Sequence, residues 1–381
     1  MNTTAPPHAP KDVVTVKQTA QALLLHEQGS RMQVQEIVLP EVGPGRVRVR
    51  MHAMGVCHSD LSLANGTLKQ HTPAVLGHEG SGVIVDVGPG VTKVVEGDHV
   101  ILNWAPSCGE CHFCLLDESH LCAHASDAAM APYATLTGGT PVFAGLGTAA
   151  FSSDVVLSER AVLKLPQDIP LDLAGVIGCS VFTGVGAVLN SAKVQAGESV
   201  TVVGLGGIGL CAVQGARIAG AHPIIAIDVN PAKADLAKEL GADHFLVADE
   251  DTPGQVRELT GGIGSDHVIE CVGLASTIRQ SWSMSRRGGR VTVLGVGRRD
   301  EKVEFSPIEL FHFARTLTGC VFGDSNPAHD LPRIVDFIRS GALRLEPLIS
   351  RRITLDEIDT AFEQMSAGDG ARSLVVMEAA L

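Results

Sequence analysis

The chain has 381 residues, of which 45% are hydrophobic and 19% are charged. This length and composition describe about two compact domains and exclude a disordered protein. Because 42 acidic residues outnumber 29 basic ones, the formal charge is −13, which disfavours nucleic-acid binding and favours a small-molecule partner. No apolar run reaches the roughly 20 residues that a membrane-spanning helix needs, so no membrane association is expected.

The first 20 residues are polar, lack arginine and contain no apolar signal-peptide core. We therefore expect residues 1–20 to form a flexible tail on a cytoplasmic protein. Strand-like runs follow at 20–39, 46–54 and 83–87, with the turn sequence PEVGPG between the first two. Short strands and frequent turns predict a largely antiparallel, barrel-like domain. A long, loop-rich segment is expected at 123–153.

Four of the nine cysteines stand close together, as Cys108, Cys111, Cys114 and Cys122. Disulfides between such near neighbours would be strained, and a reducing compartment disfavours them. Four thiolates at short spacing in a loop fit a closed tetrahedral zinc site, whereas the spacing of a ferredoxin cluster is absent. The cluster therefore predicts a structural zinc ion.

Residues 198–230 have the pattern of a dinucleotide-binding unit. A β-branched run at 200–203 leads into three glycines with the spacing G-x-G-x-x-G, namely Gly204, Gly206 and Gly209. These glycines permit a tight turn, close approach of the backbone to a pyrophosphate and close packing of helix on strand. Asp228 follows at the end of the next apolar run, where a carboxylate would hold the adenosine ribose. The segment predicts NAD binding; the alternative is a glycine-rich turn in another kind of α/β protein.

The pattern of 198–230 continues along the chain. Six apolar strands are expected at 200–204, 224–228, 244–247, 268–272, 291–295 and 317–321, and the helical stretches between them predict a doubly wound parallel sheet. After residue 322 the chain alternates helix and strand again, at 331–340, 349–353, 355–366 and 373–377. We therefore expect a catalytic domain of residues 21–180 and 322–381 that encloses a cofactor domain of residues 181–321.

These motifs occur together in one known family. GVCHSDLS at 55–62, LGHEG at 76–80, the four-cysteine cluster and the glycine motif resemble, in the same order, the zinc-containing alcohol dehydrogenases of the medium-chain dehydrogenase/reductase superfamily. The resemblance covers residues 21–378 and is closest to the dimeric, long-loop branch. It implies a GroES-like catalytic domain, a Rossmann cofactor domain, two zinc ions per subunit, NAD and a homodimer.

The resemblance also assigns the site residues. It implies that Cys57, His78 and Cys179 bind the catalytic zinc, although each alone could be an ordinary core residue. Asp60 and Glu79 would lie behind these ligands, and Ser59 would take the proton of the alcohol. The implied contacts to the cofactor are His58, Thr183, Gly204, Gly206, Gly207, Gly209, Asp228, Lys233, Val296 and Arg372.

The implied reaction is oxidation of an alcohol by hydride transfer to NAD. Glutathione-adduct dehydrogenases of the family carry an arginine and an acid where this chain has Ser126 and Leu68, and Gly145 replaces a large side chain. The resemblance therefore favours bulky hydrophobic, aromatic or terpenoid primary alcohols, in a pocket lined by Leu68, Trp104, Leu146 and Val296. The alternatives are a thiol-adduct-dependent formaldehyde dehydrogenase and, in another class, a non-catalytic zinc- and NAD-binding protein. Where the family's proton relay ends in histidine, this chain has Ser62.

Overall fold

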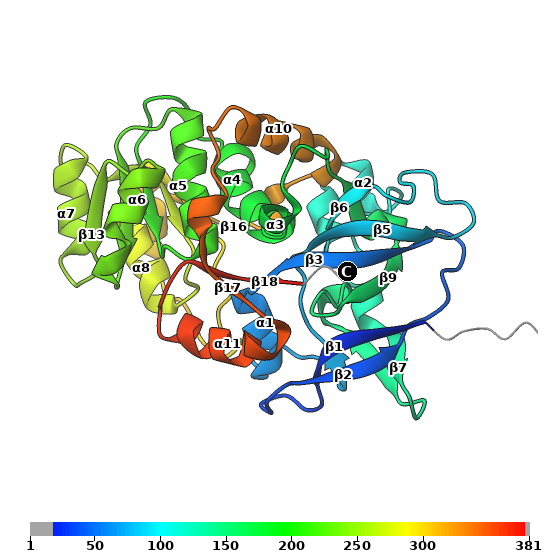
Figure 1. Ribbon diagram of the computed structural model, residues 1–381. Coiled ribbons are helices and arrows are strands. Elements are labelled where there is room, and N and C mark those ends of the chain that lie inside the picture. The colour runs from blue at the N-terminus through cyan, green and yellow to red at the C-terminus, as the bar shows by residue number, and fades with distance from the viewer. Residues whose placement is uncertain (1–17, 378–381) are drawn as a thin grey trace, which may run out of the picture.

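The computed structural model describes residues 18–377, so the expected tail at 1–20 lies almost entirely outside the described residues. Figure 1 shows a helix-covered parallel sheet at one end of the molecule and a region rich in β-strands at the other. Helix α1, the π-helices near α4 and the C-terminal strands lie where the two regions meet. No helix within 18–377 is long and apolar enough to cross a membrane.

The parallel sheet contains six strands in the order β13-β12-β11-β14-β15-β16. All its strand pairs are parallel, and the central strands are buried along their length because helices cover both faces. The order reverses direction at β11, which is the doubly wound arrangement that the sequence predicts. The strands are β11 Val200–Val203, β12 Ile224–Asp228, β13 His244–Val247, β14 Ser265–Glu270, β15 Ser285–Val293 and β16 Thr316–Gly319. The connecting helices are α5 Gly207–Ala219, α6 Ala234–Leu240, α7 Thr252–Leu259, α8 Ala275–Met284 and α9 Pro307–Phe313.

The β-rich region combines a closed barrel, β1-β2-β7-β8-β4, with a second sheet, β10-β6-β5-β3-β18-β17, in which β9 also pairs with β3. Most pairs are antiparallel, which confirms the expected class of fold; β4–β8 and β17–β18 are parallel. The strands are β1 Thr19–Leu25, β2 Gln33–Val38, β3 Arg46–Gly55, β4 Ala74–Val75, β5 Ser81–Val87, β6 His99–Leu102, β7 Pro132–Leu136, β8 Pro141–Ala144, β9 Asp154–Ser158, β10 Val162–Lys164, β17 Ile349–Ile353 and β18 Arg372–Val376.

Two sequence-based expectations about this region were wrong in detail. The run 20–39 is a hairpin of β1 and β2 and not one strand, because Gly29 turns the chain with φ of +86°. The segment 123–153 is not only loop, since β7 and β8 form a second hairpin within it. The alternation in β3 is as expected: Val47, Val49 and Met51 are buried.

The stretch 171–190 is helical but not regular. It runs through α3 (Leu171–Ala174), a π-helix at Ile177–Val181, α4 (Phe182–Gly186) and a second π-helix at Ala187–Ala192. Such π-helical turns are frequent at functional sites. The first of them carries Cys179.

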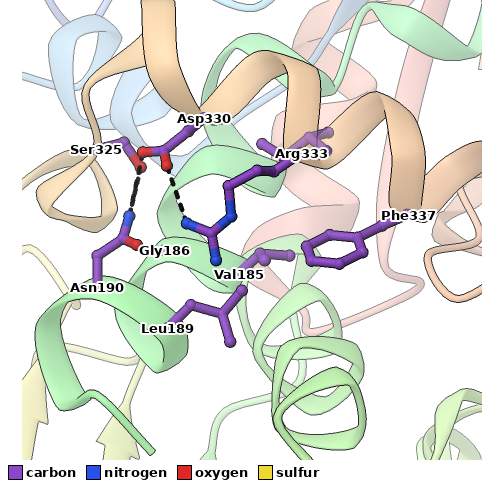
Figure 2. Close-up of a pocket in the computed structure, with 9 residues that line it drawn as sticks. Val185, Gly186, Leu189, Asn190, Ser325, Asp330, Arg333 and Phe337 are labelled. Carbon is purple, nitrogen blue, oxygen red and sulfur yellow. Dashed lines mark hydrogen bonds and ion pairs between the residues drawn. The ribbon is translucent and has the colours of Figure 1, made fainter.

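The C-terminal segment returns to this seam through helix α10 (Pro327–Arg339), before α11 (Ile358–Ser366). Figure 2 shows Asp330 of α10 between Asn190 and Arg333: Asn190 donates a hydrogen bond to it at 3.1 Å, and Arg333 pairs with it at 3.3 Å. Phe337 and Leu189 line the small cavity beside this contact. The remaining cavity of about 10 Å³ has room for no more than a water molecule, so this seam is a packed joint.

Candidate metal centres and cofactor cleft

Two cysteines and one histidine from separate segments meet at one buried point. Cys57 precedes helix α1 (His58–Ala64), His78 lies between β4 and β5, and Cys179 lies in the first π-helix. His78 Nε2 is 3.3 Å from Cys179 Sγ, and all the donor atoms lie within 4.8 Å of one another. Two thiolates and an imidazole are a typical catalytic zinc set that leaves a fourth position for substrate. The structure thus brings the three expected ligands together.

Asp60, one turn along α1 from Cys57, orients the histidine. Its Oδ1 is 2.9 Å from His78 Nδ1 and accepts a second hydrogen bond from the Gly77 N–H at 3.1 Å. Asp60 is completely buried. A carboxylate bound at Nδ1 fixes the tautomer and leaves Nε2 for the metal. Asp60 thus lies behind a zinc ligand, which is the position that the family resemblance implies for it.

Glu79 and Arg372 form a buried ion pair beside these ligands. Glu79 Oε1 lies 3.2 Å from Arg372 Nη2 and accepts a hydrogen bond from Ser180 Oγ at 2.9 Å. Arg372 also donates to Ser180 Oγ and, at 2.8 Å, to the Val56 carbonyl. Burial raises the pKa of Glu79 to about 7, and the Arg372 guanidinium opposes that shift. A carboxylate oxygen of Glu79 also lies within 4.8 Å of the donor atoms of Cys57, His78 and Cys179.

The two thiols respond in opposite ways to their mutual contact. Hydrogen bonding with Cys179 lowers the pKa of Cys57, and the charges of Arg372 and His78 lower it further. The same contact, together with burial, raises the pKa of Cys179. A divalent cation favours the thiolate form of both, so zinc binding at this point releases a proton.

The four clustered cysteines form a second centre, around the short helix α2 (His112–Leu115). Their sulfur atoms are 3.6 to 3.9 Å apart for Cys111–Cys114, Cys108–Cys114 and Cys111–Cys122. Sulfurs placed about 2.3 Å from a tetrahedral zinc are about 3.8 Å apart, so the cluster fits that ion. Backbone N–H groups point at the sulfurs and favour thiolates; they belong to Cys108, Glu110, Cys111 and His124.

The glycine motif follows β11 and opens helix α5. Gly204 has φ of +87°, which side-chain-bearing residues rarely adopt, and a Cβ on Gly209 would clash with the Gly204 carbonyl oxygen. A Cβ on Gly206 would meet no atom within 4 Å. Gly204 thus makes the turn, and Gly209 permits close packing of the helix. Gly206 faces open space at the helix N-terminus, where a pyrophosphate can bind.

A cleft of about 300 Å³ runs from the glycine motif to Cys57, one of the three expected zinc ligands. It lies where the order of the parallel sheet reverses, between β11 and β14, which is where doubly wound sheets bind dinucleotides. Thr183, an expected cofactor contact, is buried in α4 and does not line the cleft. Expected residues that do line it are Cys57, His58, Ser59, Gly204, Gly206, Gly207, Gly209, Asp228, Lys233, Val296 and Arg372.

Asp228 and Lys233 form a charged pair at one end of this cleft. Asp228 Oδ2 accepts hydrogen bonds from the Leu205 N–H at 2.7 Å and from Lys233 Nζ at 3.0 Å. The Asn230 N–H donates to Oδ1 at 2.9 Å. An acceptor and a donor side by side suit the neighbouring hydroxyls of a ribose.

The side chains beside the zinc ligands are aromatic. The Trp104 ring stands edge-on to His78 with centroids 6.2 Å apart, and Phe322 packs on Trp104 at 5.1 Å and on Phe182 at 5.4 Å. We call Trp104, Phe182 and Phe322 the aromatic wall. Sequence reasoning missed Phe182 and Phe322, because Phe322 reaches the wall through a left-handed turn, with φ of +57°, that no periodicity indicates.

The expected substrate pocket is not one cavity. Trp104 and Leu146 line a separate cavity, whereas Val296 lines the cofactor cleft. Leu68 lines neither; it is half-buried against the core of the barrel. Ser180 was also missed, although it follows Cys179 directly and bridges Glu79 and Arg372.

Comparison with known proteins agrees with this geometry. The alcohol dehydrogenase GroES-like domain model matches residues 43–167, and the zinc-binding dehydrogenase model matches residues 207–340. The alcohol dehydrogenase class-3 of Cereibacter sphaeroides is 37% identical over 92% of this chain and 97% of its own length. An S-(hydroxymethyl)glutathione dehydrogenase of Paracoccus denitrificans is 36% identical over the same shares. The structure of benzyl alcohol dehydrogenase from Acinetobacter calcoaceticus has a TM-score of 0.88 at 27% identity, covering 95% of this chain and all of that one.

The fold, the two clusters of metal ligands and the glycine-lined cleft define a zinc-dependent oxidoreductase with a nicotinamide cofactor. The chain belongs to the zinc-containing alcohol dehydrogenases of the medium-chain dehydrogenase/reductase superfamily. It is an enzyme whose cofactors are NAD and zinc, and its two cysteine-rich sites fit two zinc ions. The alternative of a non-catalytic relative is therefore set aside.

Proposed function

We propose that the enzyme oxidises bulky hydrophobic primary alcohols, of the aromatic or terpenoid kind, to aldehydes. The observation that carries this proposal is the mostly apolar cavity of about 220 Å³ that Trp104, whose ring stands edge-on to His78, lines together with Leu146. Each methylene buried there contributes roughly 0.8 kcal/mol, which favours large apolar substrates over ethanol. The structural similarity to a benzyl alcohol dehydrogenase supports the same class.

The chemistry divides between the cofactors and the chain. When bound, zinc lowers the pKa of the alcohol hydroxyl and NAD accepts the hydride. Cys57, His78 and Cys179 would hold the zinc, and Asp60 keeps His78 Nε2 turned toward it. We assign proton acceptance to Ser59, which lines the cleft beside Cys57 and would pass the proton toward the nicotinamide ribose.

The cofactor contacts follow from the cleft. The N-terminus of α5 would hold the pyrophosphate, and Arg372, whose guanidinium lies against Gly207, adds a positive charge there. Asp228 and Lys233 would bind the adenosine ribose. A carboxylate in that place would repel the additional phosphate of NADP, so we propose a preference for NAD.

A second candidate substrate is the adduct of formaldehyde with a thiol. The 36% identity to an S-(hydroxymethyl)glutathione dehydrogenase favours it. Against it, Ser126 and Leu68 stand where glutathione-dependent relatives have charged anchors. An alcohol panel with NAD tests both: we expect benzylic or allylic alcohols to exceed ethanol well over tenfold in kcat/KM. Equal rates with ethanol, or oxidation of the thiol adduct alone, would contradict the proposal.

We propose that the enzyme is a homodimer joined through the edge of the parallel sheet. Strand β16 is an edge strand, and the adjacent helix α9 exposes Ile308, Leu310 and Phe311, the last to 82%. An open strand edge beside apolar side chains is a typical interface. Light scattering should give the mass of two chains, and Phe311→Glu should shift it toward one chain without unfolding the protein.

We further propose the domain division stated above, with residues 181–321 as the cofactor domain, and a cytoplasmic location. None of the nine cysteines, all of which lie among the described residues, forms a disulfide, which suits a reducing compartment. Cell fractionation tests the location. Independent folding of residues 181–321 tests the boundary, and an unfolded fragment would contradict it.

A further inference from the structure

Two loops of the parallel-sheet region form one wall of the cofactor cleft. The first loop, 271–274, follows β14, and the second, 294–297, follows β15. Asp228 ends β12 on one side of β11, whereas β14 and β15 lie on the other side. A cofactor with its adenosine ribose at Asp228 and its pyrophosphate at α5 would therefore place its nicotinamide against these loops. The loop residues that line the cleft are Cys271, Val272, Leu294, Gly295 and Val296.

Glu270, the last residue of β14, is fully buried behind the first loop. Its Oε1 accepts hydrogen bonds from the backbone N–H groups of Val272 at 3.0 Å and Gly273 at 2.9 Å. The same oxygen accepts one from the Thr277 hydroxyl at 2.7 Å, and Oε2 lies 3.1 Å from the Gly273 nitrogen. Burial raises the pKa of Glu270, and these hydrogen bonds oppose that shift. One side chain thus holds two consecutive backbone donors of the loop and the first turn of α8.

The first loop in turn fixes the place of the second. Gly273 has φ of +88°, and a Cβ on Gly295 would clash with the Gly273 backbone nitrogen. The Glu270 carbonyl accepts hydrogen bonds from the N–H groups of Leu294 at 2.8 Å and Gly295 at 3.2 Å. Because the two loops pack backbone against backbone, a shift of the first must displace the second.

We propose that Glu270 is a positioning residue for the nicotinamide half of NAD. Among the described residues, those that line the cleft do not include Glu270, so it acts through Val272 and Val296, which do. A wall that is already fixed before the cofactor arrives loses less conformational entropy when it binds. This inference rests on the proposed cofactor contacts, with the adenosine ribose at Asp228.

ADP-ribose is the discriminating probe, because it keeps the adenosine and pyrophosphate of NAD but lacks the nicotinamide. Calorimetry of the zinc-loaded enzyme, without alcohol, gives the affinity for each ligand. In Glu270→Ala we expect the affinity for NAD to fall about tenfold, since two buried backbone donors lose their acceptor. The affinity for ADP-ribose should stay unchanged. General damage to the fold would weaken the binding of both ligands alike.

Two further variants test the contact itself. Glu270→Gln should recover most of the affinity for NAD, because its amide oxygen can take the place of Oε1. Thr277→Val removes only the hydroxyl contact and should give a smaller loss, again for NAD alone. This variant keeps the proposal falsifiable if Glu270→Ala does not fold.

Asp266→Asn is the matched control on the same strand. Asp266 also binds a backbone N–H and a hydroxyl, both of Ser199, at 2.8 and 2.6 Å. It stands at the other end of β14, away from the cleft, so this variant should bind both ligands normally.

Asp228→Gly separates this inference from the proposed cofactor contacts. It should weaken NAD and ADP-ribose to the same extent, because both contain the adenosine ribose. The role of Glu270 is overturned if Glu270→Ala and Thr277→Val leave the affinity for NAD unchanged, or if they weaken ADP-ribose equally. If Asp228→Gly weakens neither ligand, the proposed place of the adenosine ribose is wrong, and the selective loss in Glu270→Ala decides the role of Glu270 by itself.

Discussion

The two metal centres of this enzyme are built in opposite ways. Four cysteines between positions 108 and 122 form the structural centre, within one partly exposed loop. The catalytic ligands lie far apart in sequence, at 57, 78 and 179, and are buried by packing of α1, a turn and a π-helix. Local spacing thus specifies the first centre, whereas the second exists only once both sheets and their seam have formed. The geometry of the structural centre is therefore set by one short segment of chain, whereas the geometry of the catalytic centre depends on the whole fold.

The largest expected effect separates these two centres directly. Cys57→Ala should abolish turnover while leaving most of the fold, because it removes one of the three ligands of the zinc ion that binds the substrate. Cys111→Ala should instead lower the melting temperature by several degrees, because loss of a structural metal costs folding free energy. Turnover and thermal unfolding, measured on both variants, check the pair. Elemental analysis that found one zinc or none per active subunit would refute the assignment.

Loss of the histidine partner should have the next largest effect. Asp60→Asn keeps the shape but weakens the contact to His78 Nδ1, so we expect a 10–100-fold loss of zinc affinity or activity. Asp127→Asn is the control at the other centre, where Asp127 pairs with His124 in an exposed position at 3.0 Å. An exposed pair contributes at most about 1 kcal/mol, so this control should be nearly silent. Equal losses in both variants would mean that Asp60 has no special role.

The glycine unit is a local motif like the structural centre, and it should be separable from the zinc chemistry. Asp228→Gly removes the acceptor for the ribose and the repulsion of a 2′-phosphate. We expect kcat/KM for NAD to fall by roughly 10- to 150-fold, since a hydrogen bond to a charged group contributes roughly 1.5–3 kcal/mol. The preference over NADP should narrow, with zinc content unchanged. Equal efficiency with NADP in the unmodified enzyme would contradict the assignment of Asp228.

The same contrast explains what the sequence could and could not predict. The parallel sheet and the four-cysteine site depend on local patterns, apolar runs and close cysteines, and both were predicted. The hairpin at 19–38 was missed because a glycine turn splits a run that reads as one strand. The strand β15 starts at Ser285, earlier than the expected residue 291. Its first residues are polar, so the apolar pattern did not reveal them.

Contacts across the fold were the hardest to predict. The Glu79–Arg372 ion pair with Ser180 joins residues that are distant in sequence, and so does the aromatic wall. Val296 and Leu146, which were expected in one pocket, line different cavities. No spacing rule places Phe322 against Trp104. The catalytic ligand set could be assigned from family resemblance and not from spacing, because its members are equally plausible as core residues when taken singly.

The smallest expected effect concerns the proton path at Ser62. This residue lies on α1 and lines the cofactor cleft, where the family's relay histidine would stand. A hydroxyl can pass a proton but cannot act as a base near neutral pH, so we expect water to complete the relay. In Ser62→His, a neutral imidazole with a pKa of about 6.5 can accept the proton, and turnover near pH 7 should rise several-fold. The gain should vanish below about pH 6, where the imidazole is already protonated. Ser62→Ala is the control and should change turnover little. An unchanged pH–rate profile in Ser62→His would show that the relay does not pass this position.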